Sequence, residues 1–288
     1  MNHDTDEQIE LITQLLANGF LYNKPVKEAQ AEQESEHKYT RIEAHNTQKQ
    51  TNQQQNSSIM QIRPDTEREH RKGTPEVILG EKKETSQIIA MAQGLLTGTG
   101  RAIISRLQPE AIVPVQLAFQ EYTVRIREEA RAMVIYSPTY TRILTGGHVG
   151  LISAGTSDIP VAEEAALIAE EMGCRVTCIY DVGVAGLHRL LRPLRDLLAE
   201  NVDVIVVAAG MDGALPSVVT GLVPVPVIGL PTSIGYGLGG RGVAALLSML
   251  QTCAPGMSVV NIDNGVGAGI TAALIANRVA HAREHQSQ

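Results

Sequence analysis

The chain has 288 residues, so one large or two smaller domains are expected, and a hydrophobic content of 43% is enough to build their cores. With 3% aromatic residues and no Trp, those cores must consist of Val, Ile, Leu and Ala. The net charge of −7 excludes a general nucleic-acid binder, because no excess of cations balances a phosphate backbone.

Cysteine content and hydropathy predict a soluble, cytoplasmic protein. Three cysteines, an odd and small number, are typical of reduced thiols. The N-terminus is polar and acidic, which does not fit a secretory signal. No uninterrupted apolar run reaches about 18 residues, so no membrane association is expected.

Two segments precede the expected globular part. Apolar positions at helical spacing between residues 5 and 20 predict an N-terminal helix within residues 1–22. Residues 23–60 hold many Gln, Glu, Asn, Lys and His and almost no large apolar side chains. Such a Gln-rich segment cannot bury enough surface to offset chain entropy, which predicts a disordered linker.

Residues 61–145 have the pattern of a small α/β domain. Strands are expected at 76–79 and 101–105, a helix at 86–96, and one or two more strands across 122–135.

From residue 146 to 288, apolar strands alternate regularly with helices. This alternation predicts the α/β class, with a parallel sheet that carries helices on both faces. The predicted strands are 149–154, 175–180, 202–208, 226–230 and 257–262, and the predicted helices are 159–172, 187–199, a short one after 210–213, 239–250 and 267–280.

Small and polar residues follow the strands of this predicted sheet. Ligands of open parallel sheets lie beyond the carboxyl ends of the strands, where helix N-termini offer N–H groups to anions. The same residues are also ordinary helix caps. The candidate substrate-binding residues are Gly155, Thr156, Ser157, Asp158, Gly210, Met211, Gly213, Ala214, Thr232, Ser233, Gly235, Tyr236, Asp263, Asn264 and Gly265.

Cys253 is the candidate nucleophile, in a Pro- and Gly-bounded loop between a helix end and the last strand. A loop thiol is a nucleophile when its pKa is lowered, although a small buried residue is the commoner fate of cysteine. Cys174 and Cys178 flank and enter a strand without His or Cys partners in the nearby sequence, so we expect core packing and no metal site there.

Three further side chains are candidates for chemistry. His188 and Arg189 follow the second strand, where the pair could shuttle a proton or contact phosphate, or could simply be exposed. Asp212, like Asp158, is either an acid–base group or a helix cap.

The strand-tip motifs, taken in order, resemble the LarB family, the pyridinium-3,5-biscarboxylic acid mononucleotide synthases that begin nickel-pincer nucleotide assembly. The resemblance covers about residues 60–282, and the C-terminal part is similar to aminoimidazole ribonucleotide carboxylase. The motifs are Gly155–Ala165, Gly183–Arg189, Gly210–Ser217, Pro231–Gly237 and Cys253–Gly265, with Arg71–Ile78 in the small domain.

The resemblance implies carboxylation of the pyridinium ring of nicotinic acid adenine dinucleotide by CO₂ or bicarbonate, with hydrolysis of its phosphoanhydride to release AMP. It implies that Cys253 adds to the ring and that Asp212 is the base. Asp212 departs from the Glu associated with this loop, which shortens the side chain by one methylene. The long polar segment at 23–60 is a second departure.

The sequence requires no cofactor, although Asp263 and the substrate's phosphates could hold Mg²⁺. By family analogy the chain is expected to form a homo-oligomer, an octamer, in which the apolar last helix could serve an interface. Two alternatives stay open: an aminoimidazole ribonucleotide carboxylase or mutase of purine biosynthesis, and a non-catalytic nucleotide-sensing domain.

Overall fold

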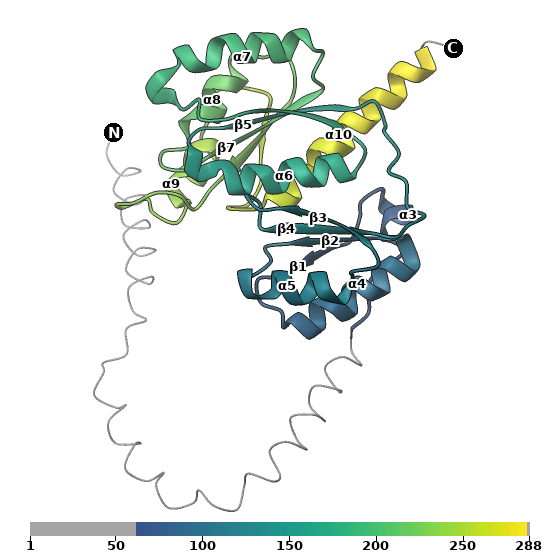
Figure 1. The fold of residues 1–288 in the computed structure, drawn as a ribbon. Coiled ribbons are helices and arrows are strands. Elements are labelled where there is room, and N and C mark those ends of the chain that lie inside the picture. The colour runs from purple at the N-terminus through teal and green to yellow at the C-terminus, as the bar shows by residue number, and fades with distance from the viewer. Residues whose placement is uncertain (1–61, 287–288) are drawn as a thin grey trace, which may run out of the picture. The chain divides into compact units, whose positions relative to one another are not determined.

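The computed structural model describes residues 62–286, which belong to one compact unit. The predicted helix within 1–22 and the predicted linker at 23–60 lie outside these residues. The unit contains two sheets (Figure 1), and we call residues 62–137 the N-lobe and residues 148–286 the C-lobe.

The C-lobe is built on a five-stranded parallel sheet of order β6-β5-β7-β8-β9. Its three central strands are buried at every residue, whereas the edge strands are partly exposed. Parallel strands covered on both faces need such apolar runs, and the predicted α/β class is confirmed. The strands are β5 His148–Ser153, β6 Arg175–Ile179, β7 Val204–Ala209, β8 Val227–Pro231 and β9 Met257–Val259.

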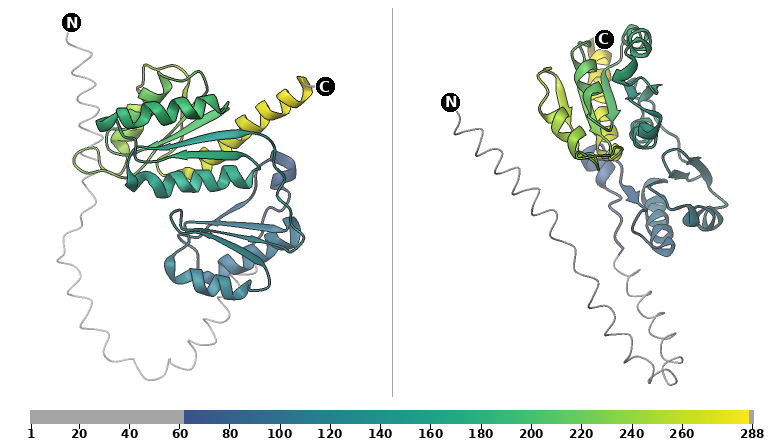
Figure 2. Two further views of the ribbon diagram at one scale, coloured as in Figure 1. Left: turned by 45° about the horizontal axis from the view of Figure 1, so that its top comes forward. Right: turned by 90° about the vertical axis from the view of Figure 1, so that its left-hand side faces the viewer.

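Helices cover both faces of this sheet (Figures 1 and 2). One face packs against α6 Ile159–Glu171 and α10 Gly265–Gln286, and the other against α7 His188–Ala199, α8 Ala214–Thr220 and α9 Val243–Leu250. Short 3₁₀ turns, η1 Thr156–Asp158 and η2 Val184–Gly186, precede α6 and α7. None of the helices between residues 62 and 286 is long and apolar enough to cross a membrane.

Helix α10, the last of the chain, packs closely along α6. A Cβ on Gly269 would lie 2.4 Å from the carbonyl oxygen of Ala165, so only glycine permits this approach of the two backbones. Ala272 and Ala276 continue the same buried face. The small-residue face of α10 is thus used inside the chain, and the interface role that the sequence allows for this helix stays a prediction.

The N-lobe has a four-stranded mixed sheet of order β1-β2-β4-β3. The sequence does not predict α5, because Pro109 and Pro114 interrupt its pattern, yet proline at the first helical turn is compatible with a helix. The elements are α3 Arg68–Lys72, β1 Val77–Leu79, α4 Thr85–Thr99, β2 Arg101–Ser105, α5 Pro109–Ala118, β3 Thr123–Arg127 and β4 Ala132–Tyr136.

Side-chain alternation gives the small sheet two buried faces. On β2, Ala102 and Ile104 pack with the helices of the N-lobe, whereas Ile103 packs with residues of the C-lobe. On β4, Val134 joins Ile103 in that second cluster. Because neighbouring residues of a strand point to opposite faces, one strand contributes to two cores.

Helix α6 also carries two pairs of glutamates that bind cations of the N-lobe. The pairs are Glu163 with Glu164 and, seven residues later, Glu170 with Glu171. Glu171 is fully buried, and its Oε2 lies 3.1 Å from Nη1 of the buried Arg101. The Tyr136 hydroxyl donates a 2.6 Å hydrogen bond to the same carboxylate, which together with burial raises the pKa of Tyr136. Glu170 lies 2.9 Å from Arg127. Two helical turns separate the pairs, so all four carboxylates lie on one side of α6.

We expect Glu171→Gln to lower the free energy of unfolding by about 3 kcal/mol, because Arg101 keeps its charge in a buried place without its buried partner. Urea denaturation measures the effect. Asp196→Asn, which removes an exposed partner of Arg192 and Arg195, is the control and should cost less than about 1 kcal/mol. Equal effects of the two changes would contradict a stabilising role for the buried pair.

Candidate active site

A cleft of about 570 Å³ lies at the carboxyl edge of the large sheet. It is lined by the loops that follow β5, β6 and β7. In the strand order, β6 and β7 lie on opposite sides of β5, so the chain changes direction across the sheet here. Open α/β sheets bind ligands at such a switch point.

Eight of the residues predicted from the strand tips line this cleft. Two loops predicted independently, 155–158 and 210–214, therefore come together. The sequence does not predict Asp181 as a site residue, although this polar residue lies two positions beyond the end of β6 and has φ of +57°. The predicted residues in the cleft are Gly155, Thr156, Ser157, Asp158, Gly210, Met211, Asp212 and Ala214.

Asp158 is buried beneath the cleft and holds three loops together. Its Oδ2 accepts a 2.9 Å hydrogen bond from the backbone N–H of Gly155, and its Oδ1 accepts a 2.6 Å bond from Oγ1 of the buried Thr232. The N–H of Gly210 donates to the same carboxylate. Burial raises the pKa of Asp158, and these hydrogen bonds oppose that rise. Asp158 is therefore a structural link between the loops that follow β5, β7 and β8.

Asp212 is one of two exposed carboxylates that line the cleft, and Asp181 is the other. Its neighbours Met211 and Gly213 have φ values of +52° and +61°. A Cβ on Gly213 would lie 2.7 Å from the backbone of Ala245, so this glycine has a packing role at the start of α8. The turn thus presents Asp212 to solvent at the mouth of the cleft, where a base can contact a ligand.

His188 and Arg189 stand outside the lining of the cleft. Both are exposed at the start of α7, and Arg189 Nη1 lies 2.7 Å from Oδ2 of Asp181, which does line the cleft. Arg189 thus reaches the cleft through Asp181. His188 forms no hydrogen bond or ion pair with the cleft residues that the structure describes.

A second cavity of about 300 Å³ adjoins the cleft, since Ser157 and Ile234 line both. It takes in the predicted residues Ser233 and Asp263, and the N–H of Ser233 donates a 2.7 Å hydrogen bond to Asp263 Oδ1. From the N-lobe, Arg106, Arg131 and Glu81 also line it, and Glu164 of α6 completes its charged groups.

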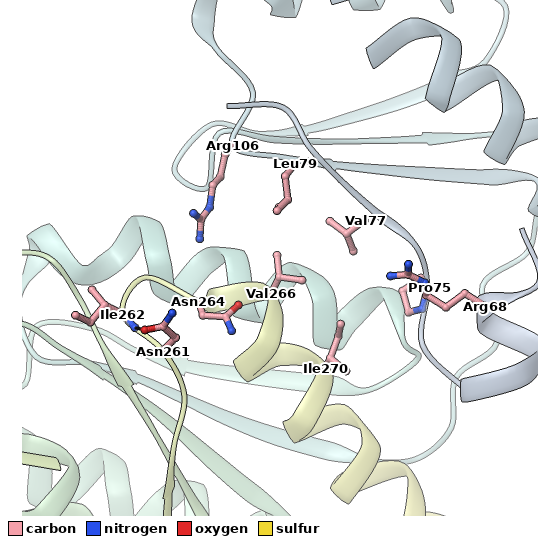
Figure 3. Close-up of a pocket in the computed structure, with 10 residues that line it drawn as sticks. All are labelled: Arg68, Pro75, Val77, Leu79, Arg106, Asn261, Ile262, Asn264, Val266 and Ile270. Atoms are coloured by element: carbon pink, nitrogen blue, oxygen red, sulfur yellow. Dashed lines mark hydrogen bonds between the residues drawn. The ribbon is translucent and has the colours of Figure 1, made fainter. Parts of the chain in front are cut away.

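A third cavity, of about 350 Å³, shares Arg106 with the second and is lined by the predicted residue Asn264 (Figure 3). Five predicted strand-tip residues lie outside the linings of these cavities, among them Gly213 and Thr232, whose contacts are described above. Gly265 is buried against α6, Tyr236 is 83% exposed, and Gly235 stands near the Met211 backbone at φ of +156°.

Cys253 lies at the opposite edge of the sheet from the cleft. It precedes β9, whose first residue Met257 pairs with Val227, the first residue of β8. Five-residue strands at about 3.3 Å per residue separate the two edges by roughly 15 Å. Cys253 and the strand-tip loops, which the resemblance implies belong to one site, therefore lie at different edges of the sheet within one chain. Its thiol is exposed.

The other two cysteines pack in the core, as expected. Cys174 is buried and Cys178 is packed against the same hydrophobic cluster. Burial raises the pKa of Cys174 to about 11 and also raises that of Cys178. Neither thiol is suited to nucleophilic catalysis at neutral pH.

Each of the two lobes matches the model of a known protein family. The model of the LarB/PurE-like N-terminal domain matches residues 56–137, and that of AIR carboxylase matches residues 148–288. An uncharacterized protein of Methanocaldococcus jannaschii is 42% identical over 218 residues, which cover 75% of this chain and 84% of that protein. The chain belongs to the LarB family.

Relatives outside the LarB family share less of the chain. The N5-carboxyaminoimidazole ribonucleotide mutase of Thermotoga maritima is 32% identical over 44% of this chain and 73% of its own length. The enzyme of the same name from Pyrococcus abyssi is 35% identical over 44% of this chain and 70% of its own. The chain thus belongs to a LarB/PurE-like enzyme family of carboxylases, with an N-lobe of the LarB type.

Within residues 62–286, no group of three or more His, Cys, Asp or Glu side chains could hold a metal ion. Mg²⁺ at Asp263 stays a prediction that depends on the phosphates of a substrate for its remaining ligands.

We expect Asp158→Asn to lower the free energy of unfolding by about 2 kcal/mol. The NH₂ group of the new amide would face a hydrogen-bond donor, from which the carboxylate oxygen now accepts a bond. Asp212→Asn should change it by less than about 0.5 kcal/mol, since that carboxylate is exposed. Chemical denaturation of both variants measures the difference. An unchanged stability of the first variant would refute the linking role of Asp158.

Proposed function

We propose that the protein carboxylates the pyridinium ring of nicotinic acid adenine dinucleotide with CO₂ or bicarbonate and hydrolyses its phosphoanhydride. The products would be pyridinium-3,5-biscarboxylic acid mononucleotide and AMP, which is the first step of nickel-pincer cofactor biosynthesis. The observation that carries the proposal is the combination, in one chain, of a carboxylate-bearing cleft at the switch point, an N-lobe of the LarB type and an exposed thiol at Cys253.

The proposed chemistry explains why the nucleophile is a thiol. A pyridinium ring is electron-poor and does not attack CO₂. Addition of the Cys253 thiolate forms a C–S bond and turns the ring into an enamine, whose carbon forms a C–C bond with CO₂. Loss of the ring proton and expulsion of the thiolate restore the aromatic pyridinium. Cysteine suits both steps, since thiolate is a strong nucleophile and a good leaving group.

The cleft offers groups for the remaining steps. Asp212 is the candidate base for the ring proton, because the other exposed carboxylate of the lining, Asp181, is paired with Arg189. The first turn at Thr156 and Ser157 presents backbone N–H groups where phosphate oxygens can bind. Water attacks phosphorus in the hydrolysis, and AMP leaves.

Because Cys253 and Asp212 lie on opposite edges of one sheet, we propose that each active site joins the Asp212 cleft of one copy to Cys253 of another. Reacting atoms must come within about 3–3.5 Å, which the separation within one chain does not allow. The expected homo-oligomer, an octamer by family analogy, is therefore a functional requirement.

Apolar side chains at the surface of the C-lobe support such an assembly. On α9, Val243, Leu247 and Leu250 are each at least half exposed and recur at helical spacing. Leu238, in the loop before this helix, is 96% exposed. Contiguous apolar surface of this kind marks protein–protein contacts, so α9 and its preceding loop replace α10 as the proposed interface.

A second candidate activity is that of an N5-carboxyaminoimidazole ribonucleotide mutase, because the C-lobe is 32–35% identical to enzymes of that name. Neither an exposed thiol nor the N-lobe has a role in that reaction, which favours the first candidate. Turnover of N5-carboxyaminoimidazole ribonucleotide, with no reaction of the dinucleotide, would decide for the second.

We expect the full-length protein to release AMP from nicotinic acid adenine dinucleotide and to incorporate label from ¹⁴C-bicarbonate into the nucleotide product. Cys253→Ala should lower carboxylation by at least about 10³-fold, because it removes the nucleophile. Cys174→Ala is the matched control and should keep most of the activity, since that thiol packs in the core. AMP release without incorporation of label would exclude the carboxylase half of the proposal.

We expect two inactive variants to complement each other if the site joins two copies. Cys253→Ala and Asp212→Asn chains, unfolded and refolded together in equal amounts, should regain about one quarter of the native activity. At random mixing, that is the share of sites with an intact Asp212 from one copy and an intact Cys253 from another. Each variant refolded alone should stay inactive, and no recovery in the mixture would contradict the shared site.

A further inference from the structure

The third cavity, which we call the α10 pocket, lies between the first turn of α10 and the N-lobe strand β1 (Figure 3). Its volume of about 350 Å³ is within the range of small-molecule sites. Val77 and Leu79 extend into it from β1, and Val266 and Ile270 extend from α10 on the other side. Two apolar walls that face each other suit a flat aromatic ring.

The polar groups of the α10 pocket are all hydrogen-bond donors or amides. Arg106 and Arg68 line it at separate places, and Asn261 and Asn264 lie at its base (Figure 3). No carboxylate belongs to its lining. Both arginines are held in ion pairs, Arg106 with Glu164 at 3.0 Å and Arg68 with Glu76 at 3.0 Å, so their guanidinium groups are fixed before a ligand arrives.

The two asparagines leave donors for a ligand. Asn264 Oδ1 accepts a 2.9 Å hydrogen bond from the N–H of Gly267, and Asn261 Oδ1 accepts one of the same length from the N–H of Ile262. These bonds fix which amide atom is oxygen. Between residues 62 and 286, neither Nδ2 has a recorded acceptor. The α10 pocket therefore favours an anionic, acceptor-rich ligand.

The α10 pocket continues into the active-site cleft. Arg106 lines both the pocket and the second cavity, and Ser157 and Ile234 line both the second cavity and the cleft. The second cavity also contains the carboxylates of Glu81, Glu164 and Asp263, of which Glu164 is paired with Arg106. A dinucleotide has two nucleosides joined by a pyrophosphate, and three adjoining spaces can hold such a ligand.

We propose that the α10 pocket binds the adenylate half of the dinucleotide, with adenine between the apolar walls and the phosphate near Arg106 and Asn264. This assignment rests on the proposed function. It gives the N-lobe a task, since Val77, Leu79 and Arg106 all lie outside the AIR carboxylase match at 148–288. The N-lobe thereby selects a dinucleotide over a mononucleotide.

Direct binding of AMP to the full-length protein, measured by isothermal titration calorimetry, tests the assignment. Asn264→Asp keeps the oxygen that caps α10 and replaces the free donor with a negative charge, so folding should be retained. We expect it to weaken AMP binding about tenfold or more. Leu79→Glu, at a wall residue that is 46% exposed, should do the same. Gln93→Glu adds equal charge on the outer helix α4 and should have no effect.

Adenosine and inorganic phosphate are titrated alongside AMP, and both should bind more weakly. Phosphate that binds as tightly as AMP would make the α10 pocket a simple anion site and overturn the assignment. So would AMP binding that is undetectable, or that both pocket variants leave unchanged. If AMP binds and the two pocket variants weaken its binding, while the dinucleotide is not carboxylated, the assignment of the α10 pocket is supported and the proposed function is contradicted.

Discussion

The active-site cleft depends on one buried carboxylate. Asp158 accepts hydrogen bonds from Gly155, Gly210 and Thr232, which follow three different strands of the sheet. Burying a carboxylate is unfavourable unless its oxygens are fully hydrogen-bonded, and here the donors come from the loops that form the cleft. The hydrogen bonds therefore offset the cost of burying the carboxylate and at the same time fix the three loops relative to one another. Asp158, which the sequence leaves open between an acid–base group and a helix cap, supports in the structure the loop that carries Asp212, the proposed base.

Helix α6 extends this constraint to the N-lobe. It begins immediately after Asp158, and its Glu164 accepts hydrogen bonds from Ser105 and Arg106. Arg106 lines both cavities beyond the cleft, so the position of their cationic group is set by the helix that also anchors the cleft loops. Glu171, two turns further along, buries an ion pair with Arg101. A change in the docking of the N-lobe must therefore move groups that line the proposed dinucleotide path.

The sequence predicts the large sheet well, because β5, β7 and β8 are buried on both faces and read as apolar runs. The convergence of loops 155–158 and 210–214 follows from the rule for parallel sheets. Helix α5 escapes prediction because its two prolines are typical of loops. The paired glutamates of α6 carry a signal, a repeat of seven in an apolar helix, but their partners lie on strands of another sheet and are recognised only in three dimensions.

Cys253 shows how a rule that predicts a site can also exclude a residue from it. Ligands bind beyond the carboxyl ends of parallel strands, and a residue between a helix and the next strand must lie at the amino ends. The place of Cys253 between a helix and the next strand along the chain is enough to assign it to that edge. The exposed thiol and Asp212 therefore stay apart in the single chain, and in the proposed shared site they would meet between two copies. The shorter side chain at Asp212 then matters less than the contact that brings Cys253 to it, because the approach of the second copy sets the distance between the two groups. Assembly through the exposed apolar face of α9 would thus determine catalytic geometry as well as stability.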